Sequence, residues 1–247
     1  MSPRCHCRGR SMKISVLIVA AGRGQRMGGR VKKQFISLGG VPLLLYALRA
    51  FEDFGGIEHI YVVLDEEDFE YCHREIIQKH GIGKVAQLVA GGKRRQDSVW
   101  NGLRVMEGRC DMVMVHDGVR PFVSPGILER LMAAMRDYQA VVTGVPARDT
   151  IKRVDGRGVV LDTLDREALF HIQTPQGFRY DIIKEAYEGA LKEGMEGTDD
   201  AYFVERMGIQ VKVVEGSPLN IKITTPEDIA LANWILQAGM LEGRESS

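Results

Sequence analysis

The feature that most constrains the fold is a repeated alternation of short apolar runs with longer segments of helical spacing. Residues 14–21 (ISVLIVAA) form a continuous apolar run rich in β-branched side chains, the pattern of a strand buried on both faces. The same analysis predicts strands at 59–64, 85–90, 111–117 and 140–146, and helices at 42–54, 66–80, 94–107 and 124–138. This alternation predicts an α/β fold with crossover connections and a mostly parallel sheet, covered by helices on both faces.

The pattern changes between about residues 147 and 180. Short alternating runs surround a DGRG turn there, and helical periodicity is absent. We expect this segment to leave the central sheet, with a β-arm at about 147–172. Helical and strand patterns then resume, and the last helix begins with Thr225 as a cap and Pro226 in the first turn. The sequence therefore predicts one domain over 13–238, preceded by a leader at 1–12 that we expect to be disordered and followed by a tail at 239–247.

Charge and cysteine content exclude several classes of protein. The 247 residues contain 33 Lys and Arg against 33 Asp and Glu, so we expect no general affinity for nucleic acid or for an anionic membrane. No apolar run approaches the length of about 18 residues that a membrane span needs. The four cysteines are too few and too scattered for a disulfide scaffold, and Cys5-His6-Cys7 lacks a second ligand pair for a metal. We expect a cytoplasmic protein with reduced cysteines.

A glycine-rich loop follows the first predicted strand. Gly22 and Gly24 match the start of the dinucleotide-binding fingerprint, but Met27 occupies its third glycine position, which argues against a nicotinamide-dependent dehydrogenase. The spacing from Gly24 to Gly29 matches the Walker loop, but Arg-Val follows where that loop has Lys-Ser or Lys-Thr. Neither familiar phosphate motif is complete.

The chemistry of this loop nevertheless suits phosphate. Glycines allow backbone N–H groups to approach an anion closely. Arg26 offers a fork of donors, and Lys33 offers a mobile point charge. A solvated surface loop is the alternative, and the combination of glycines with cations favours phosphate binding over it.

A second candidate segment, VHDGVRPF, follows the predicted strand at 111–117. Asp117 could hold Mg²⁺, which prefers carboxylate and phosphate oxygens, or it could cap a turn, as Asp-Gly often does. The segment alone does not decide between these roles. We expect His116 to pack or hydrogen-bond rather than to bind a metal. Because both segments follow strands of a parallel sheet, they are candidates for one shared cleft.

Seven blocks of the sequence resemble a known family in their order and spacing. They are AAGRGQRM with KKQF, GGKRRQDSVWNGL, VHDGVRPF, RDTIKR, DREALFHIQTPQGF, TDDA and NIKITTPED. Together they are similar to the IspD family, the 2-C-methyl-D-erythritol 4-phosphate cytidylyltransferases of the non-mevalonate isoprenoid pathway. The resemblance covers about residues 13–238 and implies a Rossmann-like nucleotidyltransferase domain.

The resemblance also implies roles for individual residues. Those expected to bind CTP are Ala20, Ala21, Gly22, Gly24, Arg26, Lys33, Gly92, Ser98 and Asp117. Those expected to bind methylerythritol phosphate are Asp117, Arg120, Thr150, Arg166, Thr174, Thr198 and Lys222. Arg26, Lys33 and Lys222 would be catalytic, and Asp117 would bind Mg²⁺. Because the arm reaches a neighbouring subunit in this family, Thr150 and Arg166 would act across a homodimer interface. Lys93 stands where some members carry an acidic residue, so we assign no base contact to its side chain.

Two alternatives remain. A ribitol 5-phosphate cytidylyltransferase would share the loop, the HD-x-x-RP segment and the TPQ segment, but Thr150 and Arg166 fit the methylerythritol pattern better. A catalytically silent nucleotide-binding module would be expected to have lost some of the charged site residues, and all of them are present here.

Overall fold

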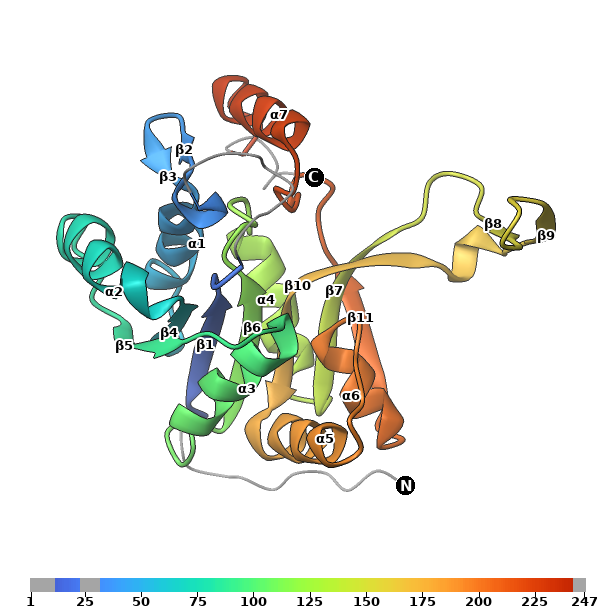
Figure 1. Ribbon diagram of the computed structural model, residues 1–247, viewed down its shortest axis with the longest axis horizontal. Coiled ribbons are helices and arrows are strands. Elements are labelled where there is room, and N and C mark those ends of the chain that lie inside the picture. Colours follow the sequence, from blue (N-terminus) through green and yellow to red (C-terminus); the bar gives the residue numbers. More distant parts are fainter. Residues whose placement is uncertain (1–11, 23–31, 242–247) are drawn as a thin grey trace.

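The computed structural model describes residues 12–22 and 32–241, and a seven-stranded sheet forms its centre (Figure 1). The strands are β1 (Ile14–Val19), β4 (Ile57–Leu64), β5 (Val85–Ala90), β6 (Met112–Asp117), β7 (Ala140–Pro146), β10 (Phe170–Arg179) and β11 (Val211–Glu215). Their order across the sheet is β11-β7-β10-β6-β1-β4-β5. The β1–β4, β1–β6, β4–β5 and β7–β11 pairs are parallel, and β10 pairs antiparallel with both β6 and β7.

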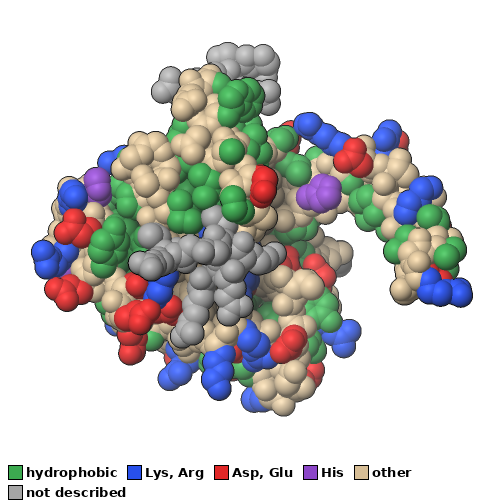
Figure 2. Space-filling model, turned by 45° about the horizontal axis from the view of Figure 1, so that its top comes forward, with side chains coloured by type: hydrophobic (Ala, Val, Ile, Leu, Met, Phe, Trp, Pro, Cys, Tyr) green, Lys and Arg blue, Asp and Glu red, His purple; other side chains and the backbone are tan. Residues whose placement is uncertain are grey.

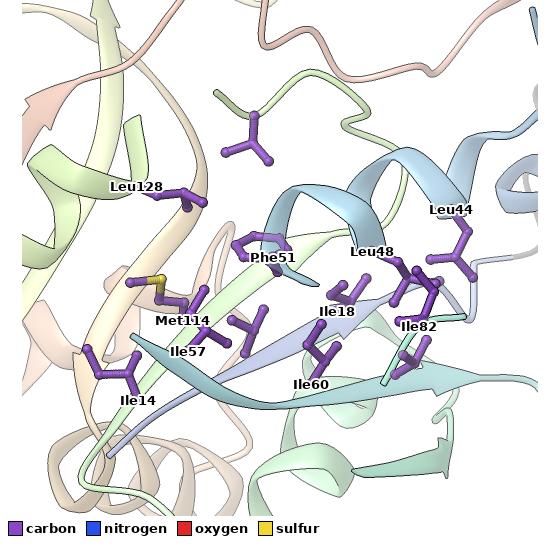
Figure 3. Close-up of a cluster of buried hydrophobic side chains, with 14 of the residues drawn as sticks. Ile14, Ile18, Leu44, Leu48, Phe51, Ile57, Ile60, Ile82, Met114 and Leu128 are labelled. Atoms are coloured by element: carbon purple, nitrogen blue, oxygen red, sulfur yellow. The ribbon is translucent and has the colours of Figure 1, made fainter. Parts of the chain in front are cut away.

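Helices cover both faces of this sheet. One face packs against α1 (Leu43–Glu52), α4 (Pro125–Ala134) and a helical stretch made of η3 (Glu66–Asp68), α2 (Phe69–Tyr71) and η4 (Cys72–Gln78). The other face packs against α3 (Arg95–Val105), α5 (Tyr180–Lys192) and α6 (Asp200–Arg206). Strand β1 serves both layers, because Ile18 joins the first cluster and Leu17 the second. Figure 3 shows the first cluster, in which Leu48 and Phe51 of α1 lie over Ile18 and Ile60 of the sheet. The predicted α/β fold with a mostly parallel sheet is confirmed.

A third, smaller cluster joins the end of the chain to its beginning. Its buried residues include Leu38 of β2 (Ser37–Leu38) and both Ala232 and Ile235 of α7 (Pro226–Gln237). Strand β2 follows η2 (Lys33–Phe35) and pairs with β3 (Val41–Pro42). Helix α7 begins as predicted, because the Thr225 N–H donates to the Asp228 carboxylate at 2.8 Å in a capping box. Among the helices of the described residues, none is long and apolar enough to cross a membrane.

The predicted arm is present. Strands β8 (Lys152–Val154) and β9 (Val160–Thr163) form a separate two-stranded sheet, and η5 (Arg166–Ala168) follows them. The arm projects from the body between the end of β7 and the start of β10 (Figures 1 and 2). Apolar side chains are exposed along it, and Leu161 is 60% exposed.

The expectation that the chain leaves the sheet as far as residue 180 is wrong for Phe170–Arg179. This segment forms β10, which lies inside the sheet between β6 and β7. The sequence pattern did not reveal this strand, because its buried positions include the polar side chains of Gln173 and Gln176. Their amides are satisfied individually: Gln173 Nε2 donates to the Ser217 carbonyl at 2.8 Å, and Gln176 Nε2 donates to Asp199 at 2.8 Å.

Candidate active site

A cleft of about 990 Å³ opens at the carboxyl ends of β1, β4, β5 and β6. This volume is large enough for a nucleotide, since small-molecule sites measure roughly 300–1,000 Å³. The residues that line it are Val19, Ala20, Ala21, Gly22, Lys33, Gln34, Asp65, Gly91, Gly92, Lys93, Arg94, Arg95, Ser98, Asp117, Val119 and Lys222. The structure therefore brings together the segments after β1 and β6 that the sequence placed at one sheet edge.

The wall next to β1 contains residues with small side chains and one basic residue. Ala20, Ala21 and Gly22 continue from the strand, and Lys33 and Gln34 face the same cleft from η2. Gln34 is 1% exposed, and its Nε2 has no hydrogen-bond partner among the described residues. The predicted phosphate ligands Gly24 and Arg26 lie outside the described residues.

Two adjacent lysines have different surroundings. Lys32 turns to the start of the helical stretch, where its Nζ bonds to Asp65 at 2.9 Å, to Asp68 at 2.7 Å and also to Glu67. Lys33, by contrast, lines the cleft. Lys32 thus ties this part of the chain to the wall formed after β4.

Close backbone packing shapes the opposite wall, after β5. A Cβ on Gly91 would lie 2.3 Å from the Cβ of Ala21, and a Cβ on Gly92 would lie 2.4 Å from that of Asp97. Neither position can accept a side chain without displacing a neighbour. The Gly92 N–H donates to Ser98 Oγ at 3.0 Å. The glycine pair therefore sets the spacing between this wall and the segment after β1.

Asp117 is the centre of charge at the base of the cleft. Its Oδ1 accepts from Arg95 Nε at 3.0 Å, its Oδ2 lies 2.7 Å from Lys222 Nζ, and Arg120 Nε is 3.9 Å from Oδ2. Burial alone would raise the pKa of this carboxyl, but the charges of Arg95 and Lys222 outweigh burial and hold the pKa far below its ordinary value. Asp117 is therefore an anion, and the cations around it outnumber it.

Behind Asp117 lies a buried network that sequence reasoning missed. Arg95 Nη1 and Nη2 donate to the two carboxylate oxygens of Asp200 at 2.9 and 2.8 Å, and Tyr187 Oη donates to Asp200 at 2.6 Å. Arg95 and Asp200 do fall within two of the recognised sequence blocks, GGKRRQDS and TDDA. That was the only available signal, because 105 positions separate the two residues.

Thr174 and His116 support the site from below. The Asp117 N–H donates to Thr174 Oγ1 at 3.0 Å, and that hydroxyl lies 3.2 Å from His116 Nδ1. His116 Nε2 lies 3.1 Å from the Arg120 carbonyl, which can only accept, so the ring carries its proton on Nε2 and accepts from Thr174 at Nδ1. The expectation that His116 packs and hydrogen-bonds is confirmed. Thr174 was predicted to bind the sugar phosphate, and its buried hydroxyl is engaged in this network.

Besides Thr174, four predicted substrate residues do not line the cleft of this chain. Arg120 lies beside Asp117, and its Nη1 donates to the Asn220 carbonyl at 2.7 Å. Thr198 is exposed just before α6, and Thr150 and Arg166 are exposed on the arm. Within one chain, the arm residues are therefore separate from the cleft. No group of three or more metal-ligating side chains occurs in the described part of the chain.

Comparison with known proteins identifies the family. Residues 14–238 match the family model described as IspD: 2-C-methyl-D-erythritol 4-phosphate cytidylyltransferase. The chain is 46% identical to the protein of that name from Geobacter metallireducens over 229 residues, which are 92% of this chain and 98% of the relative. It is 45% identical to the one from Caldanaerobacter subterraneus over 226 residues, which are 92% and 100% of the two chains.

Solved structures agree with the sequence relatives. The crystal structure of 4-diphosphocytidyl-2C-methyl-D-erythritol synthase from Anaerococcus prevotii matches with a TM-score of 0.83 and 35% identity, covering 92% of this chain and 97% of that one. The 2-C-methyl-D-erythritol 4-phosphate cytidylyltransferase of Thermus thermophilus matches with a TM-score of 0.74 and 35% identity, covering 92% and 100%. The chain therefore belongs to the IspD family of 2-C-methyl-D-erythritol 4-phosphate cytidylyltransferases.

Proposed function

We propose that this enzyme joins CTP to 2-C-methyl-D-erythritol 4-phosphate, forming 4-diphosphocytidyl-2-C-methyl-D-erythritol and pyrophosphate for isoprenoid biosynthesis. The observation that carries the proposal is the convergence in one cleft of the segment after β1, the glycine wall after β5, Asp117 and Lys222. A reaction between two phosphate-bearing substrates needs such a concentration of positive charge and backbone donors.

The nucleotide would lie between the two glycine-containing walls. Ala20, Ala21, Gly22 and Lys33 line the space proposed for the triphosphate. Because the Ala20 N–H donates to the Val63 carbonyl at 2.8 Å, we propose that the backbone donors to phosphate come from Ala21 and Gly22. Gly24 and Arg26 are proposed to complete this phosphate site. Gly92 and Ser98, on the opposite wall, would contact the cytidine.

The residues present fit a magnesium ion. Asp117 faces the cleft as an anion, and Mg²⁺ is usually held by one or two carboxylates together with substrate phosphates and water. We therefore propose that Asp117 holds Mg²⁺ bound to the CTP phosphates. When bound, the ion would neutralise charge on the nucleotide phosphates.

Transfer would proceed without a covalent enzyme intermediate. A phosphate oxygen of the sugar phosphate attacks the α-phosphorus of CTP, the bond to the β-phosphate oxygen breaks, and pyrophosphate leaves. Lys33 and Lys222 would reduce the repulsion between the two polyanions and hold the attacking oxygen in line. The enzyme's contribution is then positioning and fixed positive charge, because no proton has to be removed from an ionised phosphate.

We propose that the arm completes the acceptor site of a second copy of the chain. Thr150 and Arg166 are exposed on the arm and do not line the cleft of their own chain, and apolar side chains such as Leu161 of β9 are exposed on the same arm. A homodimer that covers these side chains would bring both polar residues to the partner's cleft. Cys72 and Cys110 are buried free thiols, which suits the reducing cytoplasm that we propose as its location.

The direct test is pyrophosphate release by the purified chain with Mg²⁺ and CTP. Methylerythritol 4-phosphate and ribitol 5-phosphate are supplied in parallel reactions. We expect release with methylerythritol 4-phosphate alone. Release with ribitol 5-phosphate alone would contradict the proposed acceptor, and CTP binding without release with either would contradict the proposed reaction.

A further inference from the structure

Two of the cations around Asp117 differ in how many contacts hold them. Lys222 touches Oδ2 from the end of a flexible side chain that is 39% exposed. Arg95 touches Oδ1, and its other two nitrogens are fixed on Asp200 at 2.9 and 2.8 Å. A guanidinium with three such contacts cannot rotate away from Oδ1 without breaking all of them. The orientation of the Asp117 carboxylate is therefore set from the Arg95 side.

Asp200 is itself immobilised. It is fully buried at the first residue of α6, and Tyr187 Oη donates to its Oδ1 at 2.6 Å. The Tyr187 ring stacks parallel to Trp100 at 6.5 Å and meets Phe203 edge-on at 4.8 Å. The Tyr187 ring is held by its aromatic neighbours, and its hydroxyl in turn holds the Asp200 carboxylate.

Neither Asp200 nor Tyr187 lines the cleft. The buried Asp200 carboxylate is costly to desolvate, and its ion pair with Arg95 adds little to stability compared with apolar packing. The geometry of this pair, by contrast, carries through Arg95 to Asp117, a carboxylate that lines the cleft. The network therefore suits orientation of Asp117 better than it suits stabilisation of the fold.

We propose that Asp200 and Tyr187 are positioning residues that act through Arg95 to hold the Asp117 carboxylate, so that Oδ2 can exchange its contact with Lys222 for the divalent cation of the bound nucleotide. This inference rests on the proposed function, because it assumes that Asp117 serves metal-bound CTP. Losing a direct hydrogen-bond partner of a metal ligand typically lowers metal affinity by about 10–100-fold. Arg95 is that partner of Asp117, and Asp200 and Tyr187 hold Arg95 in place.

The test compares two tyrosines of the same helix. Tyr187 and Tyr180 are both buried in α5, and both hydroxyls donate one short hydrogen bond, Tyr187 to Asp200 at 2.6 Å and Tyr180 to the Leu103 carbonyl at 2.7 Å. Tyr187→Phe and Tyr180→Phe therefore remove the same group from similar surroundings. Only the first change touches the proposed network. Asp200→Asn is a third, stronger variant.

Two quantities are measured for each variant: the Mg²⁺ concentration that gives half the maximal rate, and the gain in CTP affinity that Mg²⁺ produces over EDTA in calorimetry. We expect Tyr187→Phe to raise the half-saturating Mg²⁺ concentration about 3- to 10-fold and Asp200→Asn about 10- to 100-fold. Both should shrink the Mg²⁺-dependent gain in CTP affinity. Tyr180→Phe should lower the melting temperature about as much as Tyr187→Phe and leave both metal readouts unchanged.

The proposal would be overturned if Tyr187→Phe and Tyr180→Phe had the same half-saturating Mg²⁺ concentration and the same Mg²⁺-dependent gain in CTP affinity. It would also be overturned if the CTP affinity of the wild-type chain did not depend on Mg²⁺. A wild-type chain that binds CTP with Mg²⁺ but transfers to no acceptor would contradict the proposed reaction instead. The calorimetric comparison of the two tyrosine variants would still decide the positioning role.

Discussion

Single residues concentrate charge in the cleft through contacts that differ from one side chain to the next. Lys32 and Lys33 are neighbours in sequence, yet Lys32 is tied to three carboxylates while Lys33 lines the cleft. Asp117 lies between cations on both of its oxygens. The effect of removing a charge should therefore depend on its position and not on its sign alone.

The paired lysines give the first prediction. Lys33→Ala should lower kcat about 10²–10³-fold, the usual loss when one well-aimed donor to a transition-state oxyanion is removed. Lys32→Ala removes the same charge but leaves Asp65 and Asp68 without their cation beside the cleft, so it should mainly raise the KM for CTP. Steady-state kinetics with varied CTP distinguish the two. An unchanged kcat in Lys33→Ala would contradict its assignment.

His116 gives a prediction about stability. Burial lowers the pKa of its ring from 6.5 to about 4 in the folded protein. Between these values the unfolded chain binds a proton that the folded chain does not, so stability falls as the pH falls. From pH 7 to pH 5 this group should cost about 2 kcal/mol of unfolding free energy.

Urea unfolding at pH 7 and pH 5 measures that difference. In His116→Gln the pH-dependent part should shrink, even if the variant is less stable at both values. A wild-type protein with equal unfolding free energies at pH 5 and pH 7 would show that His116 is not held neutral by burial.

Sequence alone identified the residues that line the cleft better than the network behind them. Gly92, Ser98, Lys33 and Asp117 stand in local motifs, and all four line one cleft. The chain from Tyr187 through Asp200 to Arg95 was not foreseen, because it joins residues from three helices that only the tertiary fold brings together. Hydrogen bonds of this kind leave no periodic trace in a sequence.

Secondary-structure elements were likewise predicted where apolar patterns define them and missed where polar contacts do. Strands with continuous apolar runs, such as β1 and β6, were predicted because both of their faces are covered by helices. Strand β10 was missed because hydrogen-bonded amides, and not apolar side chains, fill its buried positions. The arm was predicted correctly, because its short alternating runs suit two strands outside the main core.

The arm gives a prediction at this scale. Leu161→Asp places a charge on a side chain that is 60% exposed in one chain and that we propose is covered in the dimer. This change should yield monomers in sedimentation and raise the KM for the sugar phosphate at least about tenfold, a loss of about 1.4 kcal/mol in binding. CTP affinity should stay within about twofold, because the cleft walls belong to one chain.

Leu191→Asp is the matched control. Leu191 is also an exposed leucine, but it lies on α5, away from the arm (Figure 1). Its substitution should change neither the sedimentation behaviour nor the KM. A Leu161→Asp protein that keeps the wild-type mass and KM would contradict the proposed role of the arm.

At the scale of the whole molecule, the carboxyl ends of four strands and the segment before α7 surround one cleft. Two helical layers fix the strands, and the arm extends from the same sheet without adding to either layer. The central claim is that this cleft holds both polyanions at once and that the nucleotidyl group passes directly between them. The alternative chemistry is a covalent nucleotidyl intermediate on a lysine of the cleft, such as Lys33.

The stereochemistry at the α-phosphorus distinguishes direct transfer from transfer through a covalent intermediate. The enzyme is supplied with one diastereomer of CTP that carries sulfur on the α-phosphate, together with methylerythritol 4-phosphate, and the configuration of the product is determined by ³¹P NMR. A single in-line displacement inverts the configuration, which is the result we predict. Retention would mean two successive displacements through a covalent intermediate and would contradict direct transfer in this cleft.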